Sequence, residues 1–128
     1  MKFFGVSKVF STRNQQQYLH IGEFWDYFSG IWGRENILGL GYNWRAGSIE
    51  FVIGTLNQPL NFNLAEADAK FDGCVYKEIV LPDDGWQKFC GKTEKLAELY
   101  DQIYKSGALK YEIESFDDGG NCEVLIYR

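Results

Sequence analysis

The sequence has little histidine and no cluster of basic residues, and each shortage excludes a class of protein. Binding a polyanion such as DNA or RNA needs clustered Lys and Arg. The densest basic grouping is the loose set Lys88, Lys92 and Lys95, and the net charge is −5. Direct binding to nucleic acid is therefore not expected. The single histidine, His20, has no identifiable partner, so no Ser–His or Cys–His catalytic pair can be proposed.

Cysteines and long apolar runs are also scarce. The three cysteines, Cys74, Cys90 and Cys122, are odd in number and widely spaced, which argues against a disulfide framework and against a zinc site. We expect them to be small, buried or half-buried thiols. The N-terminus lacks a charged region followed by a long apolar run, so neither a signal peptide nor a membrane span is predicted. These features predict a cytoplasmic protein with no metal, no cofactor and no membrane partner.

Aromatic residues, in contrast, are abundant, and they make up 17% of the 128 residues. Such rings fill a core or line a ligand cleft, and their number alone does not separate the two uses. The length suits one domain rather than two. We therefore expect residues 1–128 to form a single domain.

The first half of the chain predicts a strand, a helix and two strands. Residues 2–11 are rich in Val and Phe and favour a strand. Apolar residues then recur at helical spacing before Gly33, which is a plausible stop. This stripe comprises Ile21, Phe24, Trp25, Phe28, Ile31 and Trp32. Two strands are expected at 37–44 and 48–56, joined by a turn at 45–47. Residues 57–72 are expected to be a loop with a short helical turn near 64–69.

The second half predicts the same elements in the same order. A strand beginning near Cys74 ends at Pro82, and a further strand follows the turn at 83–85. Thr93 is a good N-cap for the next helix, which ends near Gly107. The apolar stripe of this helix comprises Leu96, Leu99, Tyr100, Ile103 and Tyr104. Alternating strands are expected at 109–116 and 122–128, with a turn at 117–120.

The shared order predicts a duplication, with halves at about 1–56 and 74–128 and a linker at 57–73. Leu38 aligns with Leu109, and Glu50 aligns with Glu123, at offsets of 71 and 73 residues. A chance match of hydrophobic pattern is the alternative. Duplicated βαββ units predict an α+β fold with a concave antiparallel sheet, two main helices on one face and a central cleft. Such seams are common ligand sites.

Strand periodicity assigns candidate residues to this cleft, which we expect on the sheet face away from the helices. In each strand Ile49, Tyr111 and similar apolar residues would meet the helices, so the glutamates would face the other way. The acidic candidates are Glu50, Glu112 and Glu123, each of which could equally be a solvated surface charge. The aromatic candidates are Trp25, Tyr42, Trp44, Tyr76, Trp86, Phe89 and Tyr127, although Trp25 is more readily explained as helix core.

The order of these motifs resembles that of the GyrI-like effector-binding domains, which include the ligand-binding modules of AraC-type and MerR-type regulators and stand-alone integron-associated proteins. The resemblance covers nearly the whole chain. It is carried by EFWDYF in the first helix, IEFVIGTL, IVLPDDGWQKFCG, IYKSG, YEIE at Glu112 and EVLIYR at Glu123. It implies a cleft for aromatic, amphipathic, often cationic compounds. It also implies a buried acid at the cleft floor, with Glu123 as the best match and Glu112 as the second.

Three functions are compatible with these features. The first is a small-molecule binding protein that senses or sequesters a drug or metabolite in transcription regulation or drug resistance, alone or through a separate regulator protein. The second, also implied by the resemblance, is a hydrolase that opens strained cyclopropane rings with a Glu, here Glu123, as general base. The third is a protein-interaction role, which the scattered acids favour only weakly.

Overall fold

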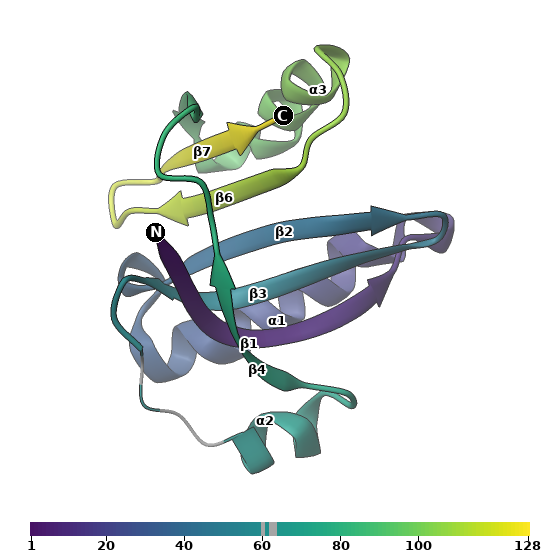
Figure 1. Cartoon of the computed structure of the whole chain (residues 1–128), viewed down its shortest axis with the longest axis vertical. Coiled ribbons are helices and arrows are strands. Elements are labelled where there is room, and N and C mark those ends of the chain that lie inside the picture. Colours follow the sequence, from purple (N-terminus) through teal and green to yellow (C-terminus); the bar gives the residue numbers. More distant parts are fainter. Residues whose placement is uncertain (60, 62–63) are drawn as a thin grey trace.

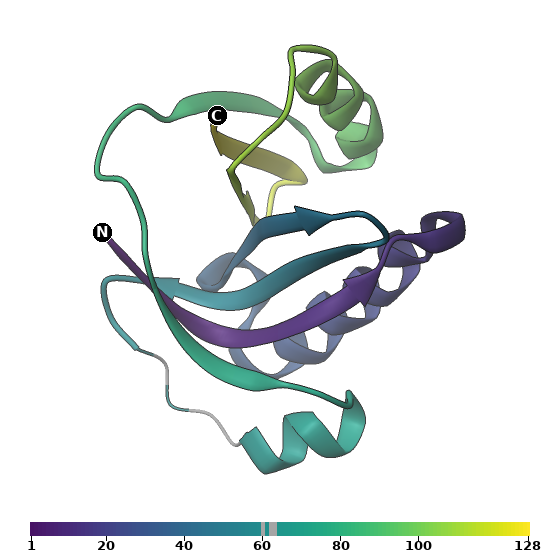
Figure 2. The ribbon, with the colours of Figure 1, turned by 45° about the vertical axis from the view of Figure 1, so that its right-hand side comes forward.

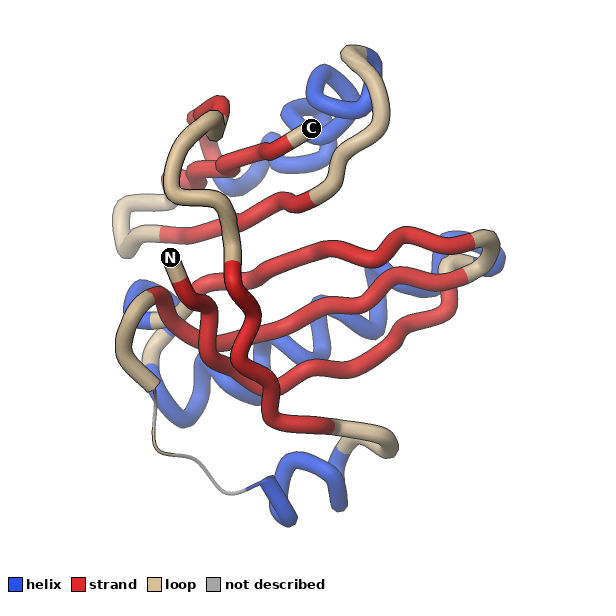
Figure 3. Tube along the Cα trace, in the orientation of Figure 1, coloured by secondary structure: helices blue, strands red, loops and turns tan. Residues whose placement is uncertain are grey.

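The computed structural model describes residues 1–59, 61 and 64–128. A seven-stranded sheet has the strand order β4-β1-β3-β2-β6-β7-β5, and every neighbouring pair is antiparallel. The strands are β1 (Lys2–Ser11), β2 (Leu38–Arg45), β3 (Ser48–Leu56), β4 (Val75–Val80), β5 (Gln87–Lys92), β6 (Tyr111–Phe116) and β7 (Asn121–Tyr127). The helices are α1 (Gln16–Trp32), α2 (Leu64–Lys70) and α3 (Leu96–Lys105). Helices α1 and α3 lie behind the sheet in Figure 1, and the same division into strands and helices is seen in Figure 3.

The strand registers confirm the duplicated βαββ fold. Tyr42 pairs with Glu50 between β2 and β3, and Ser115 pairs with Glu123 between β6 and β7. Both residues of the second pair therefore lie 73 positions after their counterparts. The alignment of Leu38 with Leu109 is wrong by two residues, because the offset of 73 places Tyr111 opposite Leu38 in the repeat. The halves join through β2 and β6, and β4 is an added edge strand beside β1.

Helix α1 forms because its apolar stripe can pack onto one face of the sheet. Phe24, Trp25 and Phe28 are buried in one cluster with Phe51 and Ile53 of β3. Burial of each large side chain contributes about 1.5–3 kcal/mol. The stripe is narrower than predicted, since Ile31 is 52% exposed. The helix ends at Gly33, whose φ of 85° suits glycine.

Helix α3 packs on the second half of the sheet, where Ile103 contacts Val124 and Ile126. Its predicted N-cap is wrong. A short 3₁₀ turn, Thr93–Lys95, precedes α3, so Thr93 lies too early in the chain to cap it, and its buried hydroxyl makes no hydrogen bond. The extra turn brings the chain from β5 into the helix.

A second apolar cluster covers the opposite face of the sheet, which is called the outer face below. It contains Leu40, Val52 and Ile113, and it is packed against Leu81 and Trp86. These last two residues belong to the connection from β4 to β5, which crosses in front of the sheet (Figures 1 and 2). The Trp86 indole N–H donates to the Pro82 carbonyl at 2.8 Å and so fixes this crossing. Both faces of the central strands are therefore buried.

The cysteines form no disulfide: Cys74 and Cys122 are buried thiols, and Cys90 is exposed. Among the described helices, none has the length and apolar character needed to cross a membrane.

Candidate functional site

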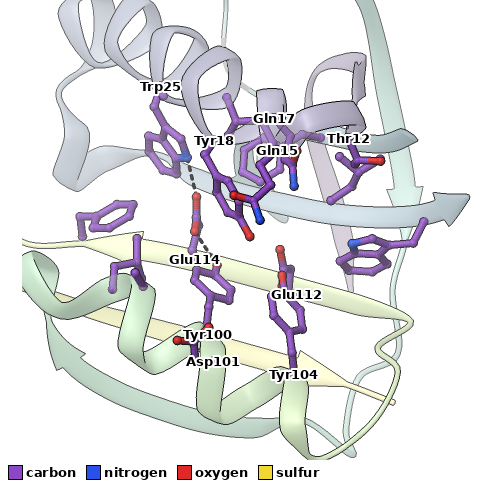
Figure 4. Close-up of a pocket in the computed structure, with 18 of the residues that line it drawn as sticks. Thr12, Gln15, Gln17, Tyr18, Trp25, Tyr100, Asp101, Tyr104, Glu112 and Glu114 are labelled. Carbon is purple, nitrogen blue, oxygen red and sulfur yellow. Dashed lines mark hydrogen bonds between the residues drawn. The ribbon is translucent and has the colours of Figure 1, made fainter. Parts of the chain in front are cut away.

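A pocket of about 780 Å³ lies between α1 and α3, above the strands at which the two halves meet. Side chains from both helices, from β3 and from β6 line it (Figure 4). The central cleft is thus on the helix side of the sheet. Our assignment of it to the opposite face is wrong, because the β4–β5 connection covers that face.

The floor of the pocket carries two glutamates of β6, Glu112 and Glu114. We expected them to face away from the helices, but Ile113 packs on the outer face with Leu40, and the glutamates point toward α1 and α3. The sequence pattern misled here because both faces of β6 are buried. An alternation of apolar and acidic residues therefore does not identify which face meets the helices.

Each glutamate accepts hydrogen bonds from rings of the helices. Glu114 accepts from the Trp25 indole N–H at 2.6 Å and from the Tyr100 hydroxyl at 2.5 Å, and Glu112 accepts from the Tyr104 hydroxyl at 3.0 Å (Figure 4). The two tyrosines are one turn apart on α3, so one face of this helix donates hydrogen bonds to both acids. Carboxylates buried among aromatic rings are costly unless they are paired or protonated.

Burial changes the acidity of these groups. Burial and, to a smaller extent, the charge of neighbouring Glu114 raise the pKa of Glu112, the Tyr104 hydrogen bond partly offsets them, and together these effects bring the pKa to about 8. Burial also raises the pKa of Glu114, although the hydrogen bonds from Tyr100 and Trp25 and the charge of Arg34 act in the opposite direction. The pocket therefore holds a carboxyl that titrates near neutral pH.

Two glycines of β2 make room on the pocket floor, Gly41 for Glu112 and Gly39 for the rings of Trp25 and Phe51. Gly41 pairs directly with Glu112, and Gly39 pairs with Glu114. A Cβ at Gly41 would lie 2.9 Å from a carboxylate oxygen of Glu112, and one at Gly39 would lie 2.7 Å from the Trp25 ring. At the repeat offset of 73, Gly39 is equivalent to Glu112 and Gly41 to Glu114. One half of the duplication thus supplies space at the positions where the other supplies carboxyl groups.

Aromatic rings and one arginine form the walls. The lining rings are those of Tyr18, Trp25, Trp44, Phe51, Tyr100, Tyr104 and Phe116. Tyr18 is 66% exposed, and Figure 4 shows its hydroxyl directed toward the carboxyl of Glu112. The Arg34 guanidinium lies 4.2 Å from the centroid of Phe116 and 5.7 Å from that of Trp25. The arrangement provides flat apolar surfaces around acidic groups.

Three of the residues predicted for the site line this pocket: Trp25, Trp44 and Glu112. The other seven predicted residues lie elsewhere: Glu50, Tyr42, Tyr76, Trp86, Phe89, Glu123 and Tyr127. They lie on the outer face of the sheet, on the edge strand β4, or on the helix side of β5.

Glu50 and Tyr42 belong to a polar cluster on the outer face. Glu50 is 7% exposed and accepts hydrogen bonds from Ser7 at 2.6 Å, from Tyr42 at 2.5 Å and from Lys77 at 2.5 Å. Although burial raises the pKa of Glu50, the hydrogen bonds from Lys77, Ser7, Tyr42 and Asn43 together lower it to about 2. These donors belong to the fold itself, so the carboxylate is satisfied without a ligand.

Glu123 also points to the outer side, where it is partly exposed and lies 3.7 Å from Lys88 in a separate shallow hollow beside Cys90. The rings of Trp86 and Tyr127 contact each other in a tilted arrangement, with their centroids 5.6 Å apart. Phe89 packs on the helix side against the Ile103 cluster. Tyr76 is 38% exposed on the edge strand β4.

Sequence reasoning missed Glu114, Tyr100, Tyr104 and Arg34, all of which line the pocket. A signal for the first three was present. A strand with Gly-X-Gly at 39–41 and a strand with Glu-X-Glu at 112–114 occur in equivalent parts of the two halves. Tyrosines at i and i+4 on the second helix complete the pattern. No comparable signal marks Arg34.

Comparison with known proteins gives no relative: no family model, no curated protein and no solved structure matches the chain. Within the described part of the chain, no group of three or more His, Cys, Asp or Glu residues is arranged to hold a metal ion.

Proposed function

We propose that this protein binds a planar aromatic cation in the pocket between α1 and α3, with Glu112 as the anionic anchor. The observation that carries the proposal is a buried carboxyl group on the floor of a ring-lined cavity of about 780 Å³. Ligand cavities in proteins commonly have this size and this mixture of apolar walls with few polar groups.

The state of Glu112 favours a cationic ligand over a neutral one. Among the described residues, the side chain that donates a hydrogen bond to the Glu112 carboxyl is Tyr104, and its hydroxyl reaches one of the two carboxyl oxygens. A buried carboxylate without a cation is unfavourable, which is why its pKa is raised. A ligand cation would supply the missing charge and release the proton. The surrounding rings would each add a cation–π attraction of about 0.5–2 kcal/mol.

The test compares a fluorescent cation with its uncharged parent. We expect ethidium to bind more tightly than 3,8-diamino-6-phenylphenanthridine, which has the same rings without the fixed charge. Glu112→Gln should weaken ethidium binding by at least about tenfold, since loss of one partner of a buried charge pair costs about 2 kcal/mol or more. It should leave the neutral compound's dissociation constant unchanged. Fluorescence titration measures all four values.

Glu123→Gln is the matched control, because this glutamate lies outside the pocket in an exposed ion pair with Lys88. Its ethidium affinity should equal that of the unchanged protein. Equal binding of the charged and uncharged compounds, or equal loss with both variants, would refute the role of Glu112.

A hydrolase that opens strained rings is the second candidate, and the pKa of Glu112 near 8 favours it. A carboxyl poised near neutral pH beside the Tyr104 hydroxyl is suited to general acid–base chemistry. The role that we expected for Glu123 would then pass to Glu112. Mass spectrometry of a cyclopropane-bearing electrophile after incubation separates the candidates: a ring-opened product that disappears with Glu112→Gln supports catalysis, and recovery of the intact compound supports binding alone.

The wider role is part of the same proposal. The GyrI-like resemblance, the duplicated fold and the acidic pocket together support a drug or metabolite sensor or a sequestering protein. We place it in the cytoplasm, acting alone or through a separate regulator protein. The low number of clustered basic residues favours a small-molecule partner over nucleic acid.

A further inference from the structure

We propose that Arg34 makes the pocket selective for singly charged ligands. Its guanidinium lies against the rings of Phe116 and Trp25, of which Trp25 is hydrogen-bonded to Glu114, and one cation site remains, at Glu112. This inference rests on the proposed function and specifies the charge of the ligand class. It follows from a difference between the two ends of the pocket floor: Arg34 lies at the Glu114 end and not at the Glu112 end.

The floor is built as two similar sites. Glu112 and Glu114 are two residues apart on the same face of β6, so their Cα atoms are about 7 Å apart along the strand. Each has its own tyrosine from α3, Tyr104 for the first and Tyr100 for the second. Each also stands opposite a glycine of β2. By shape alone, the floor could accept a ligand with two cationic groups.

The Glu114 site, however, already contains a cation. Gly33 ends α1 and turns the chain, and Arg34 begins the short 3₁₀ turn that follows. The Arg34 guanidinium lies 4.2 Å from the Phe116 centroid and 5.7 Å from the Trp25 centroid, in the range of cation–π contacts. Trp25 also donates its indole N–H to Glu114, so a ring that contacts the Arg34 guanidinium is hydrogen-bonded to the acid.

Among the described residues that line the pocket, Arg34 is the only Lys or Arg, so the Glu112 site has no such cation. The charges and hydrogen bonds that act on Glu112 come from Glu114 and Tyr104, whereas the charge of Arg34 acts on Glu114. Two further acids of the lining, Asp26 and Asp101, are exposed at its rim, where water screens them. A second ligand cation near Glu114 would meet the Arg34 charge and compete for the same rings. Only Glu112 is then available to a ligand cation among these two acids.

The test uses ethidium and propidium, which share one phenanthridinium ring system; propidium carries a second, quaternary ammonium group on a propyl chain. We compare the unchanged protein with Arg34→Met, which keeps side-chain length without charge, and with Arg34→Lys. Lys88→Met controls for the loss of one positive charge away from the pocket. Fluorescence titration gives both dissociation constants for each protein.

The unchanged protein should bind ethidium at least as tightly as propidium. Arg34→Met should improve propidium binding relative to ethidium by about tenfold, through relief of the like-charge contact and release of the rings. Arg34→Lys and Lys88→Met should leave the ratio of the two dissociation constants within about twofold, since the pocket keeps its cation.

Three results would overturn the inference. One is tighter binding of propidium than of ethidium by the unchanged protein. Another is an Arg34→Met variant whose two affinities change by the same factor. The third is an equal change in the ratio with Lys88→Met, which would indicate a long-range effect of net charge. In each of these cases ethidium still binds, so the proposed function survives; failure of the unchanged protein to bind either dye would remove both.

Discussion

Two glutamates that occupy equivalent positions in the repeat have different environments. Glu50 and Glu123 are related by the offset of 73 residues, and both point to the outer side of the sheet. Glu50 is enclosed and bonded to Lys77, which reaches over β1 from the edge strand β4. Glu123 has a 40% exposed side chain and a looser contact of 3.7 Å with Lys88. In the described part of the chain, the second half has no strand equivalent to β4 that would enclose Glu123 in the same way.

We predict that Lys77→Met destabilises the protein by about 1–3 kcal/mol, because Glu50 stays buried after the loss of its cation. Lys88→Met at the equivalent ion pair should cost less than about 0.5 kcal/mol, as for exposed pairs in general. Urea unfolding measures both free energies. Equal destabilisation by the two substitutions would contradict the difference in burial on which the prediction depends. Ethidium affinity should not change with either variant, since neither lysine lines the pocket.

The elements of the fold were predictable, and the orientation of one of them was not. The stripe that includes Phe24 and Phe28 predicted α1, and the alternation in 48–56 predicted β3 with Phe51 toward the helices. Strand β6 failed the same reasoning, because Ile113 and Glu114 are both buried, on opposite faces. Periodicity separates the two faces of a strand, but it does not by itself identify which of two buried faces meets the helices.

The candidate site was predictable only in part for the same reason. Trp44 and Glu112 follow from composition and strand pattern, but the pairing of β2 with β6 creates the site, and this is a contact between the two halves. A register between distant strands is not encoded in local pattern. The pairs Gly41–Glu112 and Gly39–Glu114 therefore emerge only from the assembled sheet.

Strand β2 should influence binding through the space that its glycines leave. We predict that Gly41→Ala weakens ethidium binding by at least about threefold and costs about 1 kcal/mol of stability or less. The new Cβ would lie 2.9 Å from a flexible carboxyl end of Glu112 and would move it rather than the backbone. Gly30→Ala in α1 is the control: its Cβ meets open space, so stability should rise by about 0.5–1 kcal/mol without a change in affinity. Titration and thermal unfolding separate the two effects, and an unchanged affinity for Gly41→Ala would oppose this account of the floor.

At the scale of the whole molecule, the sheet carries buried acids of opposite character on its two faces. On the outer face, donors from three strands hold Glu50 ionised. On the helix face, burial is the main cause that raises the pKa of Glu112 to about 8, so this carboxyl is protonated below that pH. The first arrangement stabilises the fold with no further partner. The second leaves a group whose charge depends on what enters the pocket, and this separates the structural face from the candidate binding face.

These two faces predict how global stability depends on pH. The pKa of Glu50 falls from 4.5 to about 2 on folding, so its contribution is complete above pH 4.5 and is lost as the pH falls toward 2. The pKa of Glu112 rises from 4.5 to about 8, so its protonated form favours folding below pH 4.5, and this advantage is lost as the pH rises through 8. The free energy of unfolding should therefore be highest in mildly acid solution and fall by a few kcal/mol toward pH 8.

Glu112→Gln should remove most of this fall in the free energy of unfolding between mildly acid solution and pH 8, because glutamine stays neutral at every pH. The variant should be less sensitive to pH than the unchanged protein between pH 5 and 8 and should exceed it in stability at pH 8. Glu123→Gln, at an exposed site, should leave the curve unchanged. Urea unfolding at half-unit steps of pH measures the three curves. Parallel declines in the unchanged protein and in Glu112→Gln would show that other groups cause the pH dependence.

Saturating ethidium should raise stability more at pH 8 than at pH 5, because the cation binds the ionised form of Glu112 and so releases a proton.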